Sequence, residues 1–277
     1  MPTSTLFDLT ANDIKRASAK AFDAFGVNRL GFYLQKKLLA PFIRAVNYHV
    51  VAAEHAATFE KHLQYYAENF ISVDLQMLEN FLQTGEWRAA RPGLIISFDD
   101  GHRSHFEVAA PLLEKYGFTG WFFVPVGLMN LAENKIAKQD ALTVEQLKYL
   151  DNRHVVGSHT QTHLRLHKNV AFPELDFEIG GSRQNLEKLL GHEIRTFCWV
   201  GGEEENYSRN AARLVKKFYR YGFMTNNFVI GARSNPLQLQ RTNIEAENPL
   251  SLVRFQLSGL MDVFYTAKRR RVNRLTA

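Results

Sequence analysis

The stretch Leu94-Ile95-Ile96-Ser97-Phe98-Asp99-Asp100-Gly101 places two adjacent carboxylates at the end of an apolar run. A short apolar run bounded by turn residues is typical of a buried strand in a parallel sheet. Neighbouring side chains on a strand point to opposite faces, but both carboxylates can reach one cleft where the strand ends and the chain turns. Gly101 permits such a sharp turn, so the stretch predicts a strand that delivers Asp99 and Asp100 to a site.

A second motif follows the apolar pair Val155-Val156, where His159 and His163 stand four residues apart. At this separation two histidines share one face of a helix, or they converge from a short turn. Two imidazoles and one carboxylate make a three-ligand site for zinc, or for cobalt or nickel, with positions open to water and substrate. The second carboxylate could then accept a proton from water, which is the equipment for metal-assisted hydrolysis of an amide or ester.

Each motif has a simpler explanation when taken alone. Asp-Asp-Gly is usually a turn, and His-x-x-x-His is more often a solvated helix face than a metal site. Here each motif follows a strand-like run, and the runs are separated by a stretch long enough for a βα unit. This combination favours an active site over two unrelated surface features.

At these residues the chain resembles the polysaccharide deacetylase family, carbohydrate esterase family four, also called the NodB-homology domain. Its hallmark segments are Thr/Ser-Phe-Asp-Asp-Gly and His-Ser/Thr-x-x-His, and both are intact here. Residues 46–49, Val-Asn-Tyr-His, are similar to the Tyr-His strand that opens the exopolysaccharide-modifying members, and 119–124 resembles their second barrel strand. The resemblance covers roughly residues 43–245 and implies an α/β fold, a distorted, incomplete (β/α)7 barrel.

The resemblance also implies roles for individual residues. Asp99 would be the general base, and Asp100, His159 and His163 would be the metal ligands. A backbone N–H of the third family segment helps to hold the oxyanion, and Gly201 could donate one here, because a backbone donor needs no particular side chain.

Two features depart from the family pattern. The usual aromatic-Pro-Tyr-Gly sequence is replaced by residues 197–202, Phe-Cys-Trp-Val-Gly-Gly, which leaves the shape of the substrate groove open. The late Leu-x-x-x-His segment, whose histidine is the general acid, is not evident after Arg241. The acid therefore stays unassigned, with His49, His102 and His105 as candidates.

The function that the resemblance implies is a metal-dependent hydrolase that removes N-acetyl groups from an acetamido sugar in a glycan or glycan precursor. The cofactor is expected to be a divalent metal, zinc first, with cobalt or nickel as alternatives. Two other functions remain open, an amidase on a non-sugar small molecule and a catalytically silent glycan-binding protein. The intact Asp99 argues against the silent protein, which would need no base beside its metal ligands.

Length and composition limit the domain organisation that the chain can have. A chain of 277 residues with 45% hydrophobic content is long enough for one large α/β domain with a substantial core. We expect a helical extension over residues 1–42, a catalytic domain over 43–248, and a C-terminal helix with a basic tail over 249–277. The single cysteine, Cys198, excludes an intrachain disulfide, and its apolar surroundings favour a core residue over a nucleophile.

The first thirty residues hold scattered charges and no uninterrupted apolar core, so we expect a soluble, cytoplasmic protein. The net charge is +6, and five basic residues fall in the last ten: Lys268, Arg269, Arg270, Arg271 and Arg274. A solvated, disordered tail is the first expectation. Reversible contact with an anionic membrane surface on the cytoplasmic side comes second, assisted by an apolar stripe over residues 30–42. Nucleic acid is disfavoured because no binding module accompanies the charge.

Local signals locate several helices. Thr143-Val144-Glu145-Gln146 is a capping box, which predicts a helix running to about residue 150. Ser208 should cap another helix, ending near Tyr221 with Gly222 as the stop. Between the third family segment and Ser208, residues 203–205 are three glutamates, which we expect to form a solvated loop, with a sugar contact as the alternative. The sequence leaves the sugar and the oligomeric state open.

Overall fold

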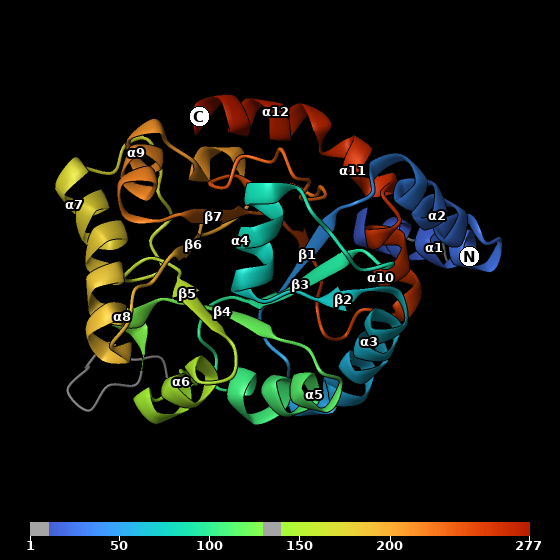
Figure 1. Cartoon of the computed structure of the whole chain (residues 1–277), viewed down its shortest axis with the longest axis horizontal. Helices are drawn as coiled ribbons and strands as arrows, with labels where there is room; N and C mark the ends of the chain where they lie inside the picture. Colours follow the sequence, from blue (N-terminus) through green and yellow to red (C-terminus); the bar gives the residue numbers. More distant parts are fainter. Residues whose placement is uncertain (1–10, 130–139) are drawn as a thin grey trace, which may run out of the picture.

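The computed structural model describes residues 11–129 and 140–277. A mostly parallel sheet forms the centre of the molecule (Figure 1), in the order β8-β7-β6-β5-β4-β3-β1-β9, with β2 (Ile71–Ser72) paired to β3 off this path. The main strands are β1 (Ile43–Tyr48), β3 (Gly93–Phe98), β4 (Gly120–Val124), β5 (Val155–Ser158), β6 (Thr196–Cys198) and β7 (Tyr221–Met224). Nearly every residue of these strands is buried, which explains why they are continuous apolar runs rather than alternating ones.

The two ends of the sheet are joined by one short segment. β8 (Leu239–Gln240) pairs with β7, and β9 (Thr242–Asn243) pairs with β1, with only Arg241 between them. The sheet therefore curls into a nearly closed barrel with a single seam at Arg241. The prediction of a distorted, incomplete (β/α)7 barrel is confirmed.

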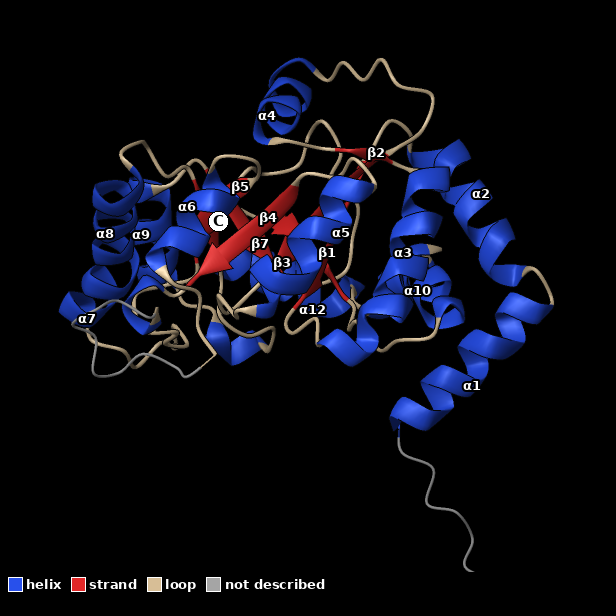
Figure 2. Cartoon of the chain, turned by 90° about the horizontal axis from the view of Figure 1, so that it is seen from below, coloured by secondary structure: helices blue, strands red, loops and turns tan. Residues whose placement is uncertain are grey.

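Helices surround the barrel and create two layers of core (Figures 1 and 2). They are α3 (Ala56–Asn69), α4 (Leu75–Thr84), α5 (Ala110–Lys115), α6 (Val144–Asp151), α7 (Phe172–Asp176), α8 (Ser182–Leu190) and α9 (Arg209–Phe218). The larger cluster of buried side chains lies between strands and outer helices. A smaller cluster fills the barrel interior, where Trp121 and Phe223 meet Leu78 and Phe81 of α4, the helix that lies across one end of the barrel (Figure 2).

Some local signals predict helix boundaries well. Thr143 forms the expected reciprocal capping box with Gln146, and the Ser208 side chain accepts from the Ala211 N–H at the start of α9. The predicted end of that helix is wrong, because α9 stops at Phe218 and Gly222 lies inside β7. A side chain at Gly222 would collide with the Leu237 carbonyl oxygen, 2.6 Å from the position of a Cβ, so this glycine serves close packing rather than helix termination.

The expectation of a disordered basic tail is also wrong. The chain continues from α10 (Leu250–Leu257) and α11 (Leu260–Phe264) into α12 (Thr266–Leu275), whose Val272 is fully buried. Arg269 donates to the carbonyl oxygens of Asn226 and Asn227, and Arg271 pairs with Glu204 at 2.9 Å. Contacts of individual arginines therefore hold the tail against the barrel, and the net charge of the tail does not reveal these contacts.

A buried ion pair joins the C-terminal helices to the barrel. Arg44 of β1 donates to Asp262 of α11 with Nη–Oδ distances of 3.0 and 2.7 Å, and both side chains are almost inaccessible to solvent. α1 (Ala11–Ala24) packs against α10, and α2 (Val27–Leu39) contributes Gln35 beside Arg44. The two ends of the sequence thus form one helical layer on the barrel (Figure 1).

Breaking this pair should be costly because one charge would stay buried without its partner. We expect Asp262→Asn to lower the free energy of unfolding by about 3–5 kcal/mol, measured by urea denaturation. Glu86→Gln is the matched control, since its partner Arg88 is exposed, and its unfolding midpoint should not move. An Asp262→Asn midpoint equal to that of Glu86→Gln would contradict the structural role of the buried pair.

Candidate active site

The two adjacent aspartates leave β3 in different directions. Asp99 is 3% exposed, whereas the Asp100 side chain is about one-third exposed. The chain turns through two successive left-handed residues, Asp100 at φ 73° and Gly101 at φ 62°, and this sharp exit sends one carboxylate inward and one into the cleft. The sequence prediction of a tight turn after the strand is confirmed.

Asp100 meets both predicted histidines. Its Oδ1 lies 2.8 Å from His163 Nε2 and 3.5 Å from His159 Nε2. The histidines follow β5 and converge through a turn rather than a helix, because Thr160 and His163 both adopt left-handed backbone conformations at φ 66° and 64°. One potential ligand atom from each of the three residues lies within 4.8 Å of the others.

These three residues fit a divalent metal ion. Among the described residues, buried Asp100 Oδ1 has no partner with hydrogen-bond geometry, so its close approach to the imidazoles reflects convergence on a common point. His159 Nδ1 lies 3.0 Å from the Cys198 carbonyl oxygen, and donation to that oxygen leaves Nε2 free as a ligand. Burial would raise the pKa of Asp100, but the two imidazoles outweigh it and hold the pKa well below its ordinary value. An ionised carboxylate beside two imidazole nitrogens is a donor set that zinc accepts.

Asp99 is held by an arginine that sequence reasoning missed. Arg241, 142 residues further along the chain, binds it with two Nη–Oδ contacts of 2.7 Å. Burial would raise the pKa of Asp99, but the facing guanidinium charge outweighs it, so the pKa lies below its ordinary value. Asp99 is therefore an ionised carboxylate, held by two contacts beside the three potential metal ligands. Arg241 also contacts the single cysteine, since its Nη2 lies 2.8 Å from Cys198 Sγ beneath the site.

Cys198 behaves as predicted, as a core residue. It is fully buried, and burial raises the pKa of its thiol.

A polar cleft of about 370 Å³ brings these groups together. Gly201 lines it in a left-handed conformation at φ 75°, and its backbone N–H has no hydrogen-bond partner among the described residues. A side chain on Gly201 would collide with the Asn206 amide, so the loop requires glycine here. Further side chains that line the cleft come from several parts of the chain: Asn47, His49, Arg165, Glu203, Thr225, Asn243, Tyr265 and Lys268.

The three candidate general acids differ in position and in pKa. Among them only His49 lines the cleft, where its Nδ1 lies 3.1 Å from Glu245 Oε1, and the bond to this carboxylate raises the pKa of His49. His105 is buried, with its Nε2 2.5 Å from the His49 carbonyl oxygen, and burial lowers its pKa to about 4. His102 is turned toward Ser104, 2.8 Å away.

The glutamate loop and the C-terminal helix meet at the rim. Glu203 reaches the cleft, where it accepts from the Gly202 N–H, while Glu204 faces outward to Arg271. Opposite them Lys268 of α12 enters the same cleft, although no sequence signal linked the basic tail to the site. Burial lowers the pKa of Lys268, and no described residue forms an ion pair with it.

The comparisons agree with this geometry. Residues 88–219 match the family model described as polysaccharide deacetylase. Among curated proteins, YxkH of Bacillus subtilis (strain 168), whose name assigns it to the polysaccharide deacetylases, is 23% identical over 168 residues. That alignment covers 60% of this chain, and the chain spans only 57% of the length of the relative.

Solved structures show the same fold. The Streptococcus pyogenes deacetylase PplD, in complex with acetate, has a TM-score of 0.66 at 22% identity, covering 78% of this chain and 98% of that one. IcaB from Ammonifex degensii has a TM-score of 0.65 at 19% identity, covering 81% and 98%. The polysaccharide deacetylase match includes both aspartates and both histidines, whereas Arg241, His49 and Lys268 fall outside its limits.

The ligand assignment can be tested by metal content. We expect His163→Ala to lose most of its bound zinc, because it removes one of three protein ligands. His192→Ala is the matched control, a surface histidine paired with Asp151 far from the cleft, and it should keep the zinc content of the native protein. Elemental analysis after dialysis against zinc measures both, and full occupancy in His163→Ala would refute the assignment.

Proposed function

We propose that the protein is a metal-dependent hydrolase that removes an N-acetyl group from an acetamido sugar of a glycan or glycan precursor. The observation that carries the proposal is the juxtaposition of a three-ligand set, Asp100, His159 and His163, with an ionised carboxylate, Asp99, in one polar cleft. The family match supports a deacetylase reaction. Asn47 and Asn243 also line the cleft, joined by a hydrogen bond of 2.8 Å, and amides of this kind can exchange bonds with the hydroxyl groups of a sugar.

The three potential metal ligands, Asp99 and Gly201 each have a task in this reaction. A divalent ion held by Asp100, His159 and His163 would polarise the acetamide carbonyl and favour deprotonation of water. Asp99 accepts a proton from the attacking water, and Arg241 keeps that carboxylate ionised and correctly oriented. The Gly201 N–H can donate to the carbonyl oxygen as negative charge develops there.

We infer that His49 supplies the proton for the leaving group. Glu245 favours the protonated imidazole, and His49 stands in the same cleft as Asp99. Donation of this proton to the sugar nitrogen accompanies cleavage of the C–N bond, which releases acetate and leaves a free amine. His49 thus takes the role for which the sequence offered three candidates.

Removing the base should separate catalysis from metal binding. We expect Asp99→Asn to keep its zinc and to lose about 100-fold or more in kcat for acetate release from N-acetylated oligosaccharides. Asp176→Asn, a half-exposed surface change on α7, is the matched control and should retain full kcat. Zinc loss in Asp99→Asn would reverse the roles of the two aspartates.

Acetate release by the native protein is itself the test of the proposed activity. No release from any N-acetylated oligosaccharide with zinc, cobalt or nickel would instead favour a glycan-binding protein or an amidase for non-sugar substrates. Glycan arrays and a panel of small amides would then separate these two alternatives.

The acid assignment predicts a shift in the pH profile. Under this assignment the enzyme is active only when His49 is protonated, so activity falls as pH rises through the pKa of His49. The hydrogen bond to Glu245 holds that pKa above the ordinary value. We expect Glu245→Gln to lower that pKa and move the alkaline limb of the kcat/KM profile to lower pH. Glu247→Gln, an exposed change two residues away, should leave the profile in place. Identical alkaline limbs in the native protein and Glu245→Gln would remove His49 from this role.

A further inference from the structure

Large apolar side chains are exposed mainly on one part of the molecule. α2 carries Leu30, Leu34 and Leu38, which recur every four residues and therefore form one stripe along the helix. α11 carries Val263 and Phe264. Leu38 and Phe264 are each 77% exposed, a degree of exposure that is unusual for such large apolar groups.

The two helices present these side chains on neighbouring surfaces. A Cβ on Gly31 would lie 3.1 Å from the Ser258 carbonyl oxygen and 3.5 Å from the Leu260 side chain, so α2 closely approaches the start of α11. In Figure 1, α2, α11 and α12 follow one another along one edge of the molecule. We call the exposed side chains Leu30, Leu34, Leu38, Val263 and Phe264 the apolar face.

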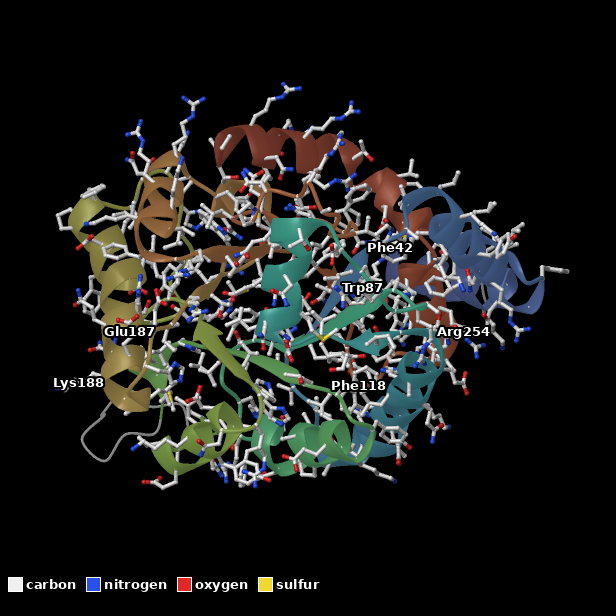
Figure 3. All side chains as sticks on the ribbon, in the orientation of Figure 1. Phe42, Trp87, Phe118, Glu187, Lys188 and Arg254 are labelled. Carbon is white, nitrogen blue, oxygen red and sulfur yellow. The ribbon has the colours of Figure 1, made fainter. Side chains whose placement is uncertain are left out.

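Unpaired cations border the apolar face. Lys37 lies beside the leucine stripe, and Arg270 and Arg274 are exposed one turn apart on α12. None of these three forms an ion pair with a described residue. Nitrogen-tipped side chains project outward from the outer side of α12 (Figure 3), which gives this edge of the molecule a positive charge.

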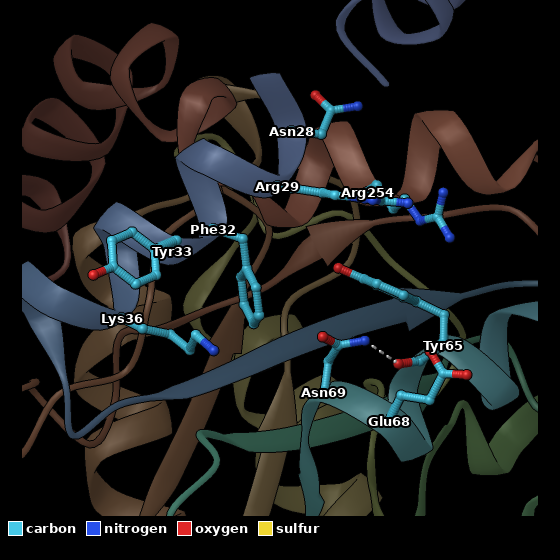
Figure 4. A pocket seen from close by; sticks show the side chains of 9 residues that line it. All are labelled: Asn28, Arg29, Phe32, Tyr33, Lys36, Tyr65, Glu68, Asn69 and Arg254. Carbon is cyan, nitrogen blue, oxygen red and sulfur yellow. Dashed lines mark hydrogen bonds between the residues drawn. The ribbon is translucent and has the colours of Figure 1, made fainter. Parts of the chain in front are cut away.

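A cleft of about 310 Å³ lies on the other exposed side of α2, between it, α3 and α10 (Figure 4). Its lining includes Arg29 and Lys36 of α2, Arg254 of α10, which pairs with Asp23, the rings of Tyr33 and Tyr65, and the carboxylate of Glu68 (Figure 4). Cations and amphipathic aromatic rings are the groups that a lipid headgroup region accommodates.

We propose that the apolar face docks the protein on the surface of an anionic lipid bilayer, with Leu38 and Phe264 inserted between headgroups and the surrounding cations against lipid phosphates. An apolar stripe flanked by lysine and arginine is the pattern of a helix that lies in the membrane interface. No helix among the described residues is both long and apolar enough to cross a bilayer.

The docked orientation has a consequence for the catalytic cleft. Tyr265 follows Phe264 directly and lines that cleft, as does Lys268 one turn later. A bilayer in contact with Phe264 therefore lies close to the rim of the cleft. This rests on the proposed function and favours a glycan carried by a membrane lipid as substrate, whereas docking itself does not depend on the reaction.

Docking can be tested by co-sedimentation of the full chain with phosphatidylcholine vesicles, with and without phosphatidylglycerol. We expect binding to the anionic vesicles, weakened as salt rises, and weaker binding to phosphatidylcholine alone. The double variant L38Q/F264Q should bind anionic vesicles at least about tenfold more weakly, because it removes two inserting side chains. F172Q/F177Q is the matched control, since it removes two exposed phenylalanines from the α7 region and should bind normally.

Three results would overturn the proposal. They are no sedimentation of the native chain with anionic vesicles, equal binding by native protein and L38Q/F264Q, and equal losses in L38Q/F264Q and F172Q/F177Q. A native dimer that light scattering shows to dissociate in L38Q/F264Q, without vesicle binding, would assign the apolar face to a second copy. Circular dichroism verifies folding of each variant, and acetate release is measured separately, so failure of docking and failure of the proposed function are distinguishable.

Discussion

The buried pair between Asp99 and Arg241 is the interaction on which the candidate active site depends. Removing both charges from water is costly, and the cost is offset only because two short, parallel hydrogen bonds join the groups. Arg241 is also the one residue between β8 and β9, at the seam of the barrel. Closing the barrel and fixing the carboxylate are therefore the same structural event, and a shifted seam would leave both charges buried without partners.

The cleft is assembled from segments that are far apart in the sequence. β3 and β5 deliver the aspartates and histidines from the middle of the chain, where the family match lies. β1 supplies His49 near one end and α12 supplies Lys268 near the other. The buried pair of Arg44 and Asp262 joins β1 to α11, the helix directly before α12, so a structural contact outside the cleft helps to hold Lys268 at its rim.

Short-range signals were predictable because the chemistry that produces them is local. The capping box at Thr143, the strand before Asp99 and the glycine turn after Asp100 depend on residues within a few positions of each other. Helix termination at Gly222 was predicted wrongly because glycine is also required where β7 closely approaches the turn before β8, and packing outweighed the local signal. Residue types and spacing do not distinguish these two uses of glycine.

The sequence by itself predicted the barrel class, through the family resemblance of its motifs. It also predicted the adjacent aspartates at a strand end, the paired histidines and the buried cysteine, because apolar runs and turn residues act over short distances. Only the tertiary structure decided that Arg241 binds Asp99, that Glu245 pairs with His49, and that the basic tail is a helix at the rim. A charged side chain can pair with any opposite charge that the fold brings within reach. Its partner is therefore chosen by the path of the backbone in space, which no local pattern contains.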